Sequence, residues 1–168
     1  MSSLFSPFAI GPLPLKNRIV IAPMCQYSAV DGAATDWHLM HLGALALSGA
    51  ALLVIEATAV EAAGRITPGC LGLWSDATEA ALQRVLQAVR AHSHMPIAIQ
   101  LGHAGRKASS HVPWQGGMLI PPDQPGGWRP LAPSALPQLE GEALPEVLDE
   151  AGIERIVGAF ADAARRAH

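Results

Sequence analysis

The 168-residue sequence has only two cysteines, one tyrosine and three phenylalanines, and charged residues make up 15% of it. Two cysteines do not make the disulfide framework of a small secreted protein, so a reducing cytoplasm is the simplest location. The formal net charge of −3 offers no basic surface for nucleic acid. No apolar run approaches the ~20 residues of a membrane helix. The N-terminus has no basic segment followed by an apolar one, so we expect no export signal.

Half of the sequence is hydrophobic, which predicts one globular domain, and 16 glycines and 14 prolines predict many loops. Apolar runs followed by turn residues predict three strands, at residues 18–22, 50–57 and 97–101. Apolar residues at helical spacing predict three helices, at residues 37–48, 75–91 and 145–167. Residues 108–146 are rich in proline and glycine and predict a long loop.

Strands that alternate with helices indicate an α/β fold with a parallel sheet. An open doubly wound sheet and a (β/α)8 TIM barrel both fit this order. No Gly-x-Gly-x-x-Gly follows the first strand, which argues against a dinucleotide-binding unit. A barrel needs about 250 residues, so we expect this chain to supply roughly the first three βα units. A complementary C-terminal half would then complete the barrel, and residues 1–17 would cover its bottom.

The first strand ends in "IVIAPMCQYS", which brings Cys25 and Tyr27 to the C-terminal end of the strand, where barrel enzymes place their chemistry. Cys25 is either a small buried thiol that fills space or a thiol beside a cofactor. A nucleophilic role is less favoured because no histidine lies near it in the sequence. The Tyr27 hydroxyl either bonds a loop or orients a substrate carbonyl.

Two histidine-containing stretches offer further candidates. In "WHLMH", His38 and His41 stand three residues apart on a predicted helix, a spacing that can hold a metal. No third ligand is evident, so packing or support of the site is favoured over a metal. The stretch "QLGHAGRK" follows the third strand and holds the other candidates: Gln100, His103, Arg106 and Lys107. The Gln100 amide offers both a donor and an acceptor, which suits the edge of a flat ring such as an isoalloxazine.

Several motifs together resemble the old yellow enzyme family of FMN-dependent ene-reductases, in the branch that includes the xenobiotic reductases. They are "NRIVIAPMCQYS", "DWHLMHLG", "EATAV", "AGRITPG", "LWSD", "QLGHAGRKAS" and "LAPSA". The resemblance covers essentially the whole chain and implies an FMN-binding (β/α)8 barrel. It also implies NADPH or NADH as hydride donor and a small activated alkene, such as an α,β-unsaturated carbonyl compound, as substrate. The complete enzyme is expected to form a homo-oligomer.

The resemblance implies a role for residues at each strand end. The cofactor-binding positions are Pro23, Met24, Cys25, Ala57 and Gln100. Cys25 matches a thiol that modulates the flavin, and Tyr27 matches a tyrosine of the substrate pocket. His103, Arg106 and Lys107 fall in the matching third-strand motif, which implies a place in the neighbourhood of the substrate or the flavin. The family's substrate-binding histidine pair and proton-donating tyrosine are expected on the next strand, beyond residue 168.

Overall fold

The computed structural model describes residues 3–168. Its strands are β1 (Phe8–Ile10), β2 (Leu13–Leu15), β3 (Val20–Ile21), β4 (Leu52–Ala59), β5 (Ile97–Gly102), β6 (Leu131–Ala132) and β7 (Glu146–Val147). Its α-helices are α1 (Asp36–Ala46), α2 (Asp76–Arg90) and α3 (Glu150–Ala167). Short 3-10 helices are η1 (Ser3–Phe5), η2 (Ala62–Gly64), η3 (Gly105–Lys107) and η4 (Pro113–Gln115).

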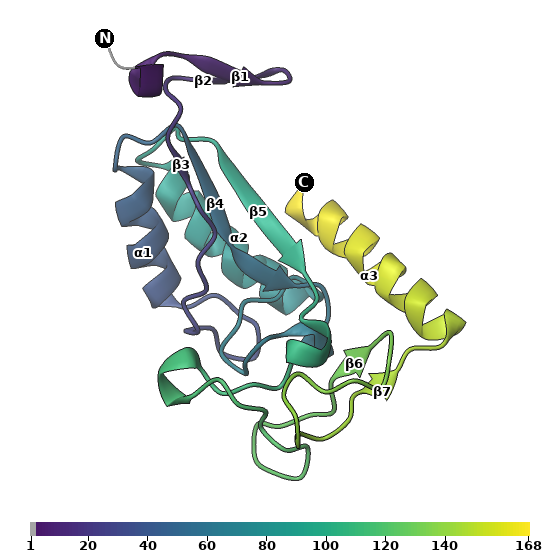
Figure 1. Ribbon diagram of the computed structural model, residues 1–168. Coiled ribbons are helices and arrows are strands. Elements are labelled where there is room, and N and C mark those ends of the chain that lie inside the picture. Colours follow the sequence, from purple (N-terminus) through teal and green to yellow (C-terminus); the bar gives the residue numbers. More distant parts are fainter. Residues whose placement is uncertain (1–2) are drawn as a thin grey trace.

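The centre of the fold is a parallel sheet in the order β3-β4-β5. Helices α1 and α2 cover one face of this sheet (Figure 1). The core lies between them and includes Leu42 of α1, Ile55 of β4 and Val85 of α2. Strand β4 is buried along most of its length, as its continuous apolar run predicts for the central strand of a parallel sheet.

The other face of the sheet is largely open in the part of the chain that the structure describes, although Leu15 of β2 packs on Leu52 at its N-terminal end. Along β5, Ile97 and Ile99 pack against the core, while Ala98 and Gln100, which alternate with them, are exposed. Alternate residues of a strand point to opposite faces, so the exposed pair marks the uncovered face. Val20 of β3 is also 44% exposed. This is the face that would point into a closed barrel.

Side-chain caps set the starts of two helices. Ser75 accepts a hydrogen bond from the Thr78 N–H at 3.3 Å and begins α2, as the sequence predicts. Asp149 accepts one from the Gly152 N–H at 2.7 Å and begins α3. The predicted start of this helix at residue 145 is therefore wrong, because β7 and the Asp149 cap come first. The first parallel strand is also shorter than predicted, since only Val20–Ile21 pair with β4.

The two ends of the parallel sheet differ. The β1-β2 hairpin lies at the N-terminal ends of the strands, and the loops gather at the C-terminal ends (Figure 1). The role of residues 1–17 as a barrel cover remains a prediction, and residues 1–2 lie outside the described part. The long loop contains β6, which pairs in parallel with β7. Within residues 3–168, no helix combines the length and hydrophobicity of a membrane span.

Candidate active site at the C-terminal ends of the strands

A cavity of about 240 Å³ opens where β4 and β5 end. Predicted site residues Ala57, Gln100 and His103 line it, together with Arg65 and Cys70 from the loop after β4. The structure thus brings the ends of two strands and one loop to a single place. We refer to these strand ends, with the segment after β3, as the rim.

Gln100 and Ala57 are direct partners in the sheet. The Gln100 side chain is exposed and makes no hydrogen bond to any of the residues 3–168, so its donor and acceptor are both available. Ala57 presents only a methyl group beside it. An amide with a free donor and a free acceptor can bind the hydrogen-bonding edge of a planar ring, and the small residue beside it leaves room for that ring.

Cys25 lies in the segment after β3, in no helix or strand, and its thiol is free and partly buried. Its sulfur contacts the backbone N–H of Ala57, so two of the predicted cofactor residues meet. Its thiol interacts with the Cys70 thiol. This interaction, burial, and the charges of Cys70 and Glu56 raise the pKa of Cys25 far above its ordinary value. Cys25 is therefore a protonated donor at neutral pH.

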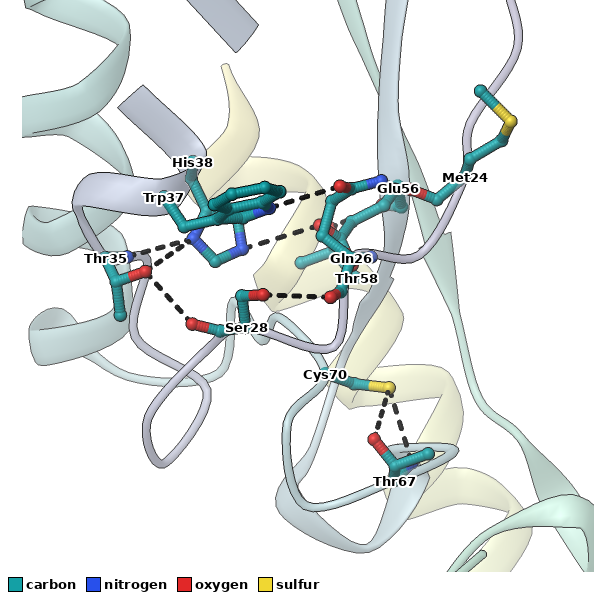
Figure 2. Close-up of polar contacts among 10 residues, drawn as sticks. All are labelled: Met24, Gln26, Ser28, Thr35, Trp37, His38, Glu56, Thr58, Thr67 and Cys70. Atoms are coloured by element: carbon teal, nitrogen blue, oxygen red, sulfur yellow. Dashed lines mark hydrogen bonds and ion pairs between the residues drawn. The ribbon is translucent and has the colours of Figure 1, made fainter. Parts of the chain in front are cut away.

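Cys70 is the partner of Cys25, which the sequence did not reveal because 45 positions separate them. Its sulfur accepts a hydrogen bond from the Thr67 N–H at 3.3 Å and lies 3.5 Å from the Thr67 hydroxyl (Figure 2). The interaction with Cys25 and the hydrogen bonds from Thr67 and Ile66 outweigh burial and lower the pKa of Cys70 to about 6. The proton of this thiol pair therefore stays on Cys25.

Tyr27 has a left-handed backbone with φ of +53°, which is uncommon for a non-glycine residue and recurs at functional sites. Its ring meets Trp114 edge to face, with 5.6 Å between the ring centres. Burial, followed by the neighbouring groups Cys25, Cys70 and Glu56, raises the pKa of Tyr27. Its hydroxyl consequently remains a proton-bearing donor. Trp114 belongs to the predicted long loop and was not recognised as a neighbour of the site.

Glu56 is a buried carboxylate behind the rim that sequence reasoning missed. It sits at a β-bulge, where β4 has one residue more than β5 between the pairs Ile55–Ile99 and Ala57–Gln100. Its Oε2 accepts a hydrogen bond from the Gln26 N–H at 2.9 Å (Figure 2). The carboxylate therefore holds the backbone of the residue that follows Cys25.

His38 lies on the other side of Glu56 and is 1% exposed. Its Nδ1 accepts a hydrogen bond from the Thr35 N–H at 3.0 Å, so its Nε2 carries the ring proton. That nitrogen faces Glu56 Oε1 at 3.4 Å, which is long for a hydrogen bond and not well aligned (Figure 2). His38 thus links the start of α1 to Glu56, in line with the supporting role favoured above. Residues 3–168 contain no cluster of three metal-binding side chains that would recruit His38 or His41.

His103 is held by a second carboxylate, Glu61. Its Nε2 lies 2.9 Å from Glu61 Oε1, and its Nδ1 accepts from the Gly105 N–H at 3.0 Å. Arg155 of α3 pairs with the same carboxylate. Gly64 packs closely on the ring, because a Cβ there would lie 2.8 Å from His103 Cδ2. Both ring nitrogens are therefore engaged, which makes His103 a fixed wall of the cavity.

The other predicted residues lie further out. Arg106 and Lys107 are exposed on η3 and do not line the cavity. Pro23 is partly buried, and Met24 is 59% exposed, in the segment that leads to Cys25. The guanidinium carbon of Arg65, which sequence analysis did not select, lies over the rings of Trp74 and Trp128, 5.5 and 5.1 Å from their centres.

Sequence comparison decides the family. The profile of the NADH:flavin oxidoreductase / NADH oxidase family matches residues 3–168. The chain belongs to this family. It is 43% identical to an "NADH:flavin oxidoreductase" of Gibberella zeae over 99% of its length, and 42% identical to an "NADPH dehydrogenase" of Geobacillus thermodenitrificans over 98%. The chain spans less than half of these relatives, 41% and 44% of their lengths.

Solved structures of the NADH:flavin oxidoreductase family share the fold. Morphinone reductase superposes on 98% of the chain with a TM-score of 0.77 and 30% identity, over 44% of its own length. An old yellow enzyme homologue from Zymomonas mobilis superposes on 99% with a TM-score of 0.76 and 29% identity, over 45% of its own length. The predicted fold class is confirmed: the three parallel strands and their helices correspond to the first units of a (β/α)8 barrel.

Proposed function

We propose that this chain forms the first part of an FMN-binding barrel in an NAD(P)H-dependent oxidoreductase that reduces the C=C bond of activated alkenes, such as α,β-unsaturated carbonyl compounds. The observation that carries the proposal is the free Gln100 amide beside Ala57 at the rim cavity. Family membership and the names of the relatives support the nicotinamide and flavin parts. When bound, the flavin supplies the hydride chemistry, and the protein orients and tunes it.

The rim residues fit one side of a flavin site. The Gln100 amide would donate to and accept from the pyrimidine edge of the ring, and Ala57 would leave room for the ring to approach. Pro23 and Met24 would line the ring from the segment after β3. The cavity of about 240 Å³ is smaller than a complete ligand pocket, typically ~300–1,000 Å³. Residues 3–168 would therefore enclose only part of the cofactor.

Tyr27 would act as a neutral donor on the substrate side. Negative charge builds on the carbonyl oxygen of an enone during its reduction, and a donor aimed at that oxygen stabilises it. The raised pKa keeps a proton on the Tyr27 hydroxyl at neutral pH. We assign Tyr27 to the orientation of the substrate carbonyl, and Cys25 to contact with the cofactor.

Replacement of Gln100 tests the cofactor assignment. Gln100→Met keeps the length of the side chain and removes both hydrogen-bonding groups. Two net hydrogen bonds of about 0.5–1.5 kcal/mol each should raise the FMN dissociation constant roughly 5- to 150-fold, measured by quenching of flavin fluorescence in the complete protein. The matched control is Gln87→Met, on the exposed side of α2, which should leave FMN binding unchanged. FMN binding by Gln100→Met equal to that of the wild type would remove the assignment.

The reaction itself is tested by enone-dependent consumption of NAD(P)H. The complete protein should oxidise the nicotinamide under exclusion of oxygen only when a cyclic enone is added, and mass spectrometry should find the saturated ketone. Saturation of the alkene without stoichiometric nicotinamide consumption would contradict the proposal, as would consumption without saturation.

We propose as a second point that a complementary C-terminal half covers the open face of the sheet, and that this chain alone is a non-catalytic half-barrel. The supporting observation is the exposed row of Ala98 and Gln100 on β5, with Val20 exposed on β3. Intact mass together with flavin absorption after gel filtration tests it. Co-elution of a second segment with FMN supports the proposal, and full turnover by residues 1–168 alone would overturn it.

A further inference from the structure

We propose that Cys25 and Cys70 form an oxidisable dithiol, which closes to an intramolecular disulfide on exposure to a peroxide. This inference concerns residues 3–168 alone and does not depend on the proposed reaction. Three observations carry it: the contact between the two thiols, the packing of the segments that bear them, and the access that the rim cavity provides.

The two thiols are neighbours within the rim. Each is the largest single influence on the pKa of the other, so the two sulfur atoms lie near each other. Both cysteines are free in this structure. Neither belongs to a helix or strand, so a movement of either cysteine towards the other would break no ladder hydrogen bonds.

Backbone contacts hold the two segments together. The Ala29 N–H donates to the Gly69 carbonyl oxygen at 2.9 Å. Gly69 also packs on the backbone of Tyr27, because a Cβ added to Gly69 would lie 2.6 Å from the Tyr27 carbonyl oxygen. The cysteines are therefore neighbours because of fixed main-chain packing, and not through one chosen side-chain rotamer.

Cys70 is the group that would react first. Its lowered pKa of about 6 makes it mostly thiolate at neutral pH, and the thiolate is the form that attacks peroxides. The residue is only 2% exposed, yet it lines the rim cavity of about 240 Å³, which admits a molecule as small as hydrogen peroxide. The Thr67 N–H stabilises the thiolate in place.

Hydrogen peroxide is the oxidant and accepts the two electrons that the thiols lose when the disulfide forms. The Cys70 thiolate attacks one peroxide oxygen, the O–O bond breaks, hydroxide leaves, and Cys70 becomes a sulfenic acid. The Cys25 sulfur then attacks the Cys70 sulfur, the S–S bond forms, the S–O bond breaks, and water leaves with the Cys25 proton. The second step becomes easier once Cys70 is oxidised, because the negative charge of its thiolate no longer holds that proton on Cys25.

Peptide mapping tests the dithiol. After treatment with hydrogen peroxide at neutral pH, the intact mass should fall by two hydrogen atoms, and a thiol reductant should restore it. Trypsin cleaves after Arg18, Arg65 and Arg84, so the linked product joins residues 19–65 to residues 66–84. A wild-type digest with sulfinic acids on the two peptides and no linked product would overturn the proposal. Disulfides between two chains in place of the internal link would also overturn it.

Two single variants separate the steps. Cys25→Ser should stop the reaction at a Cys70 sulfenic acid, which a dimedone probe traps on residues 66–84. Cys70→Ser should leave Cys25 unlabelled, because the remaining thiol has no thiolate partner to start the reaction. Rapid labelling of Cys25 in Cys70→Ser, with Cys70 unlabelled in Cys25→Ser, would reverse the assigned order and refute the role of Cys70.

Discussion

Glu56→Leu gives a direct test of how the rim is held. The leucine is close in size to the glutamate but takes the acceptor from the Gln26 N–H and removes the carboxylate that the His38 Nε2–H faces at 3.4 Å. Each buried donor left without an acceptor costs about 1–3 kcal/mol, so the free energy of unfolding should fall by about 2–6 kcal/mol for the two together. With a urea dependence of about 2 kcal/mol per molar, the unfolding midpoint should fall by about 1–3 M.

The amide variant adds a graded test. A glutamine at position 56 has one acceptor oxygen, so its NH₂ group must face either the Gln26 N–H or the His38 Nε2–H. In either orientation one N–H donor faces another donor. The free energy of unfolding should therefore fall by about 1–3 kcal/mol, the cost of one unsatisfied buried group. The expected order of stability is therefore wild type, then Glu56→Gln, then Glu56→Leu.

Urea unfolding followed by tryptophan fluorescence measures these losses. The Trp37 Nε1–H donates to Gln26 Oε1 at 3.1 Å, so its emission also reports the state of the rim. The control is Glu140→Leu at an exposed loop position, where the free energy of unfolding should change by no more than about 0.5 kcal/mol. A Glu56→Leu protein as stable as this control would refute the reasoning that Glu56 holds the segment after β3.

Three further predictions follow from the rim and the open sheet. Cys25→Ala should shift the redox potential of the flavin in the complete protein, measured by spectroelectrochemistry, and an unchanged potential would remove the role assigned to this thiol. Gly64→Ala should destabilise the protein by about 1–3 kcal/mol because its Cβ would meet the fixed His103 ring, whereas Gly102→Ala, with nothing within 4 Å of the added Cβ, should not. Residues 1–168 alone should associate or aggregate through the open sheet face; a sharp, reversible thermal transition of a clean monomer would contradict this.

The main elements of the fold could be predicted from local patterns. Continuous apolar runs located β4 and β5, and helical spacing with a Ser75 cap located α2. The start of α3 was wrong because Pro145 resembles a first helical residue, whereas the chain first forms β7 and turns at Asp149. Local sequence propensity cannot predict a strand such as β7, because that strand forms only by pairing with a partner elsewhere in the chain.

The strand-end residues could be selected from the sequence, but their supports could not. Glu56 follows an apolar run, and only the bulge in β4 shows that its carboxylate turns towards Gln26. Cys70 and Glu61 act through partners far along the chain, which no spacing rule connects. A glutamate inside an otherwise apolar strand is the one signal that could have identified Glu56, since a buried carboxylate requires partners.

The contact of Arg65 with the rings of both Trp74 and Trp128 has a consequence for the order in which the chain acquires structure. Residues of the long loop attach to the loop after β4: the Ser110 N–H donates to the Ile66 oxygen at 2.8 Å, and the Trp128 Nε1–H donates to the Ala63 oxygen at 3.0 Å. These contacts span 44 and 65 positions of sequence. Closure of such long intervals is entropically costly, so the long loop should gain protection from amide exchange only after β4 and its loop have formed.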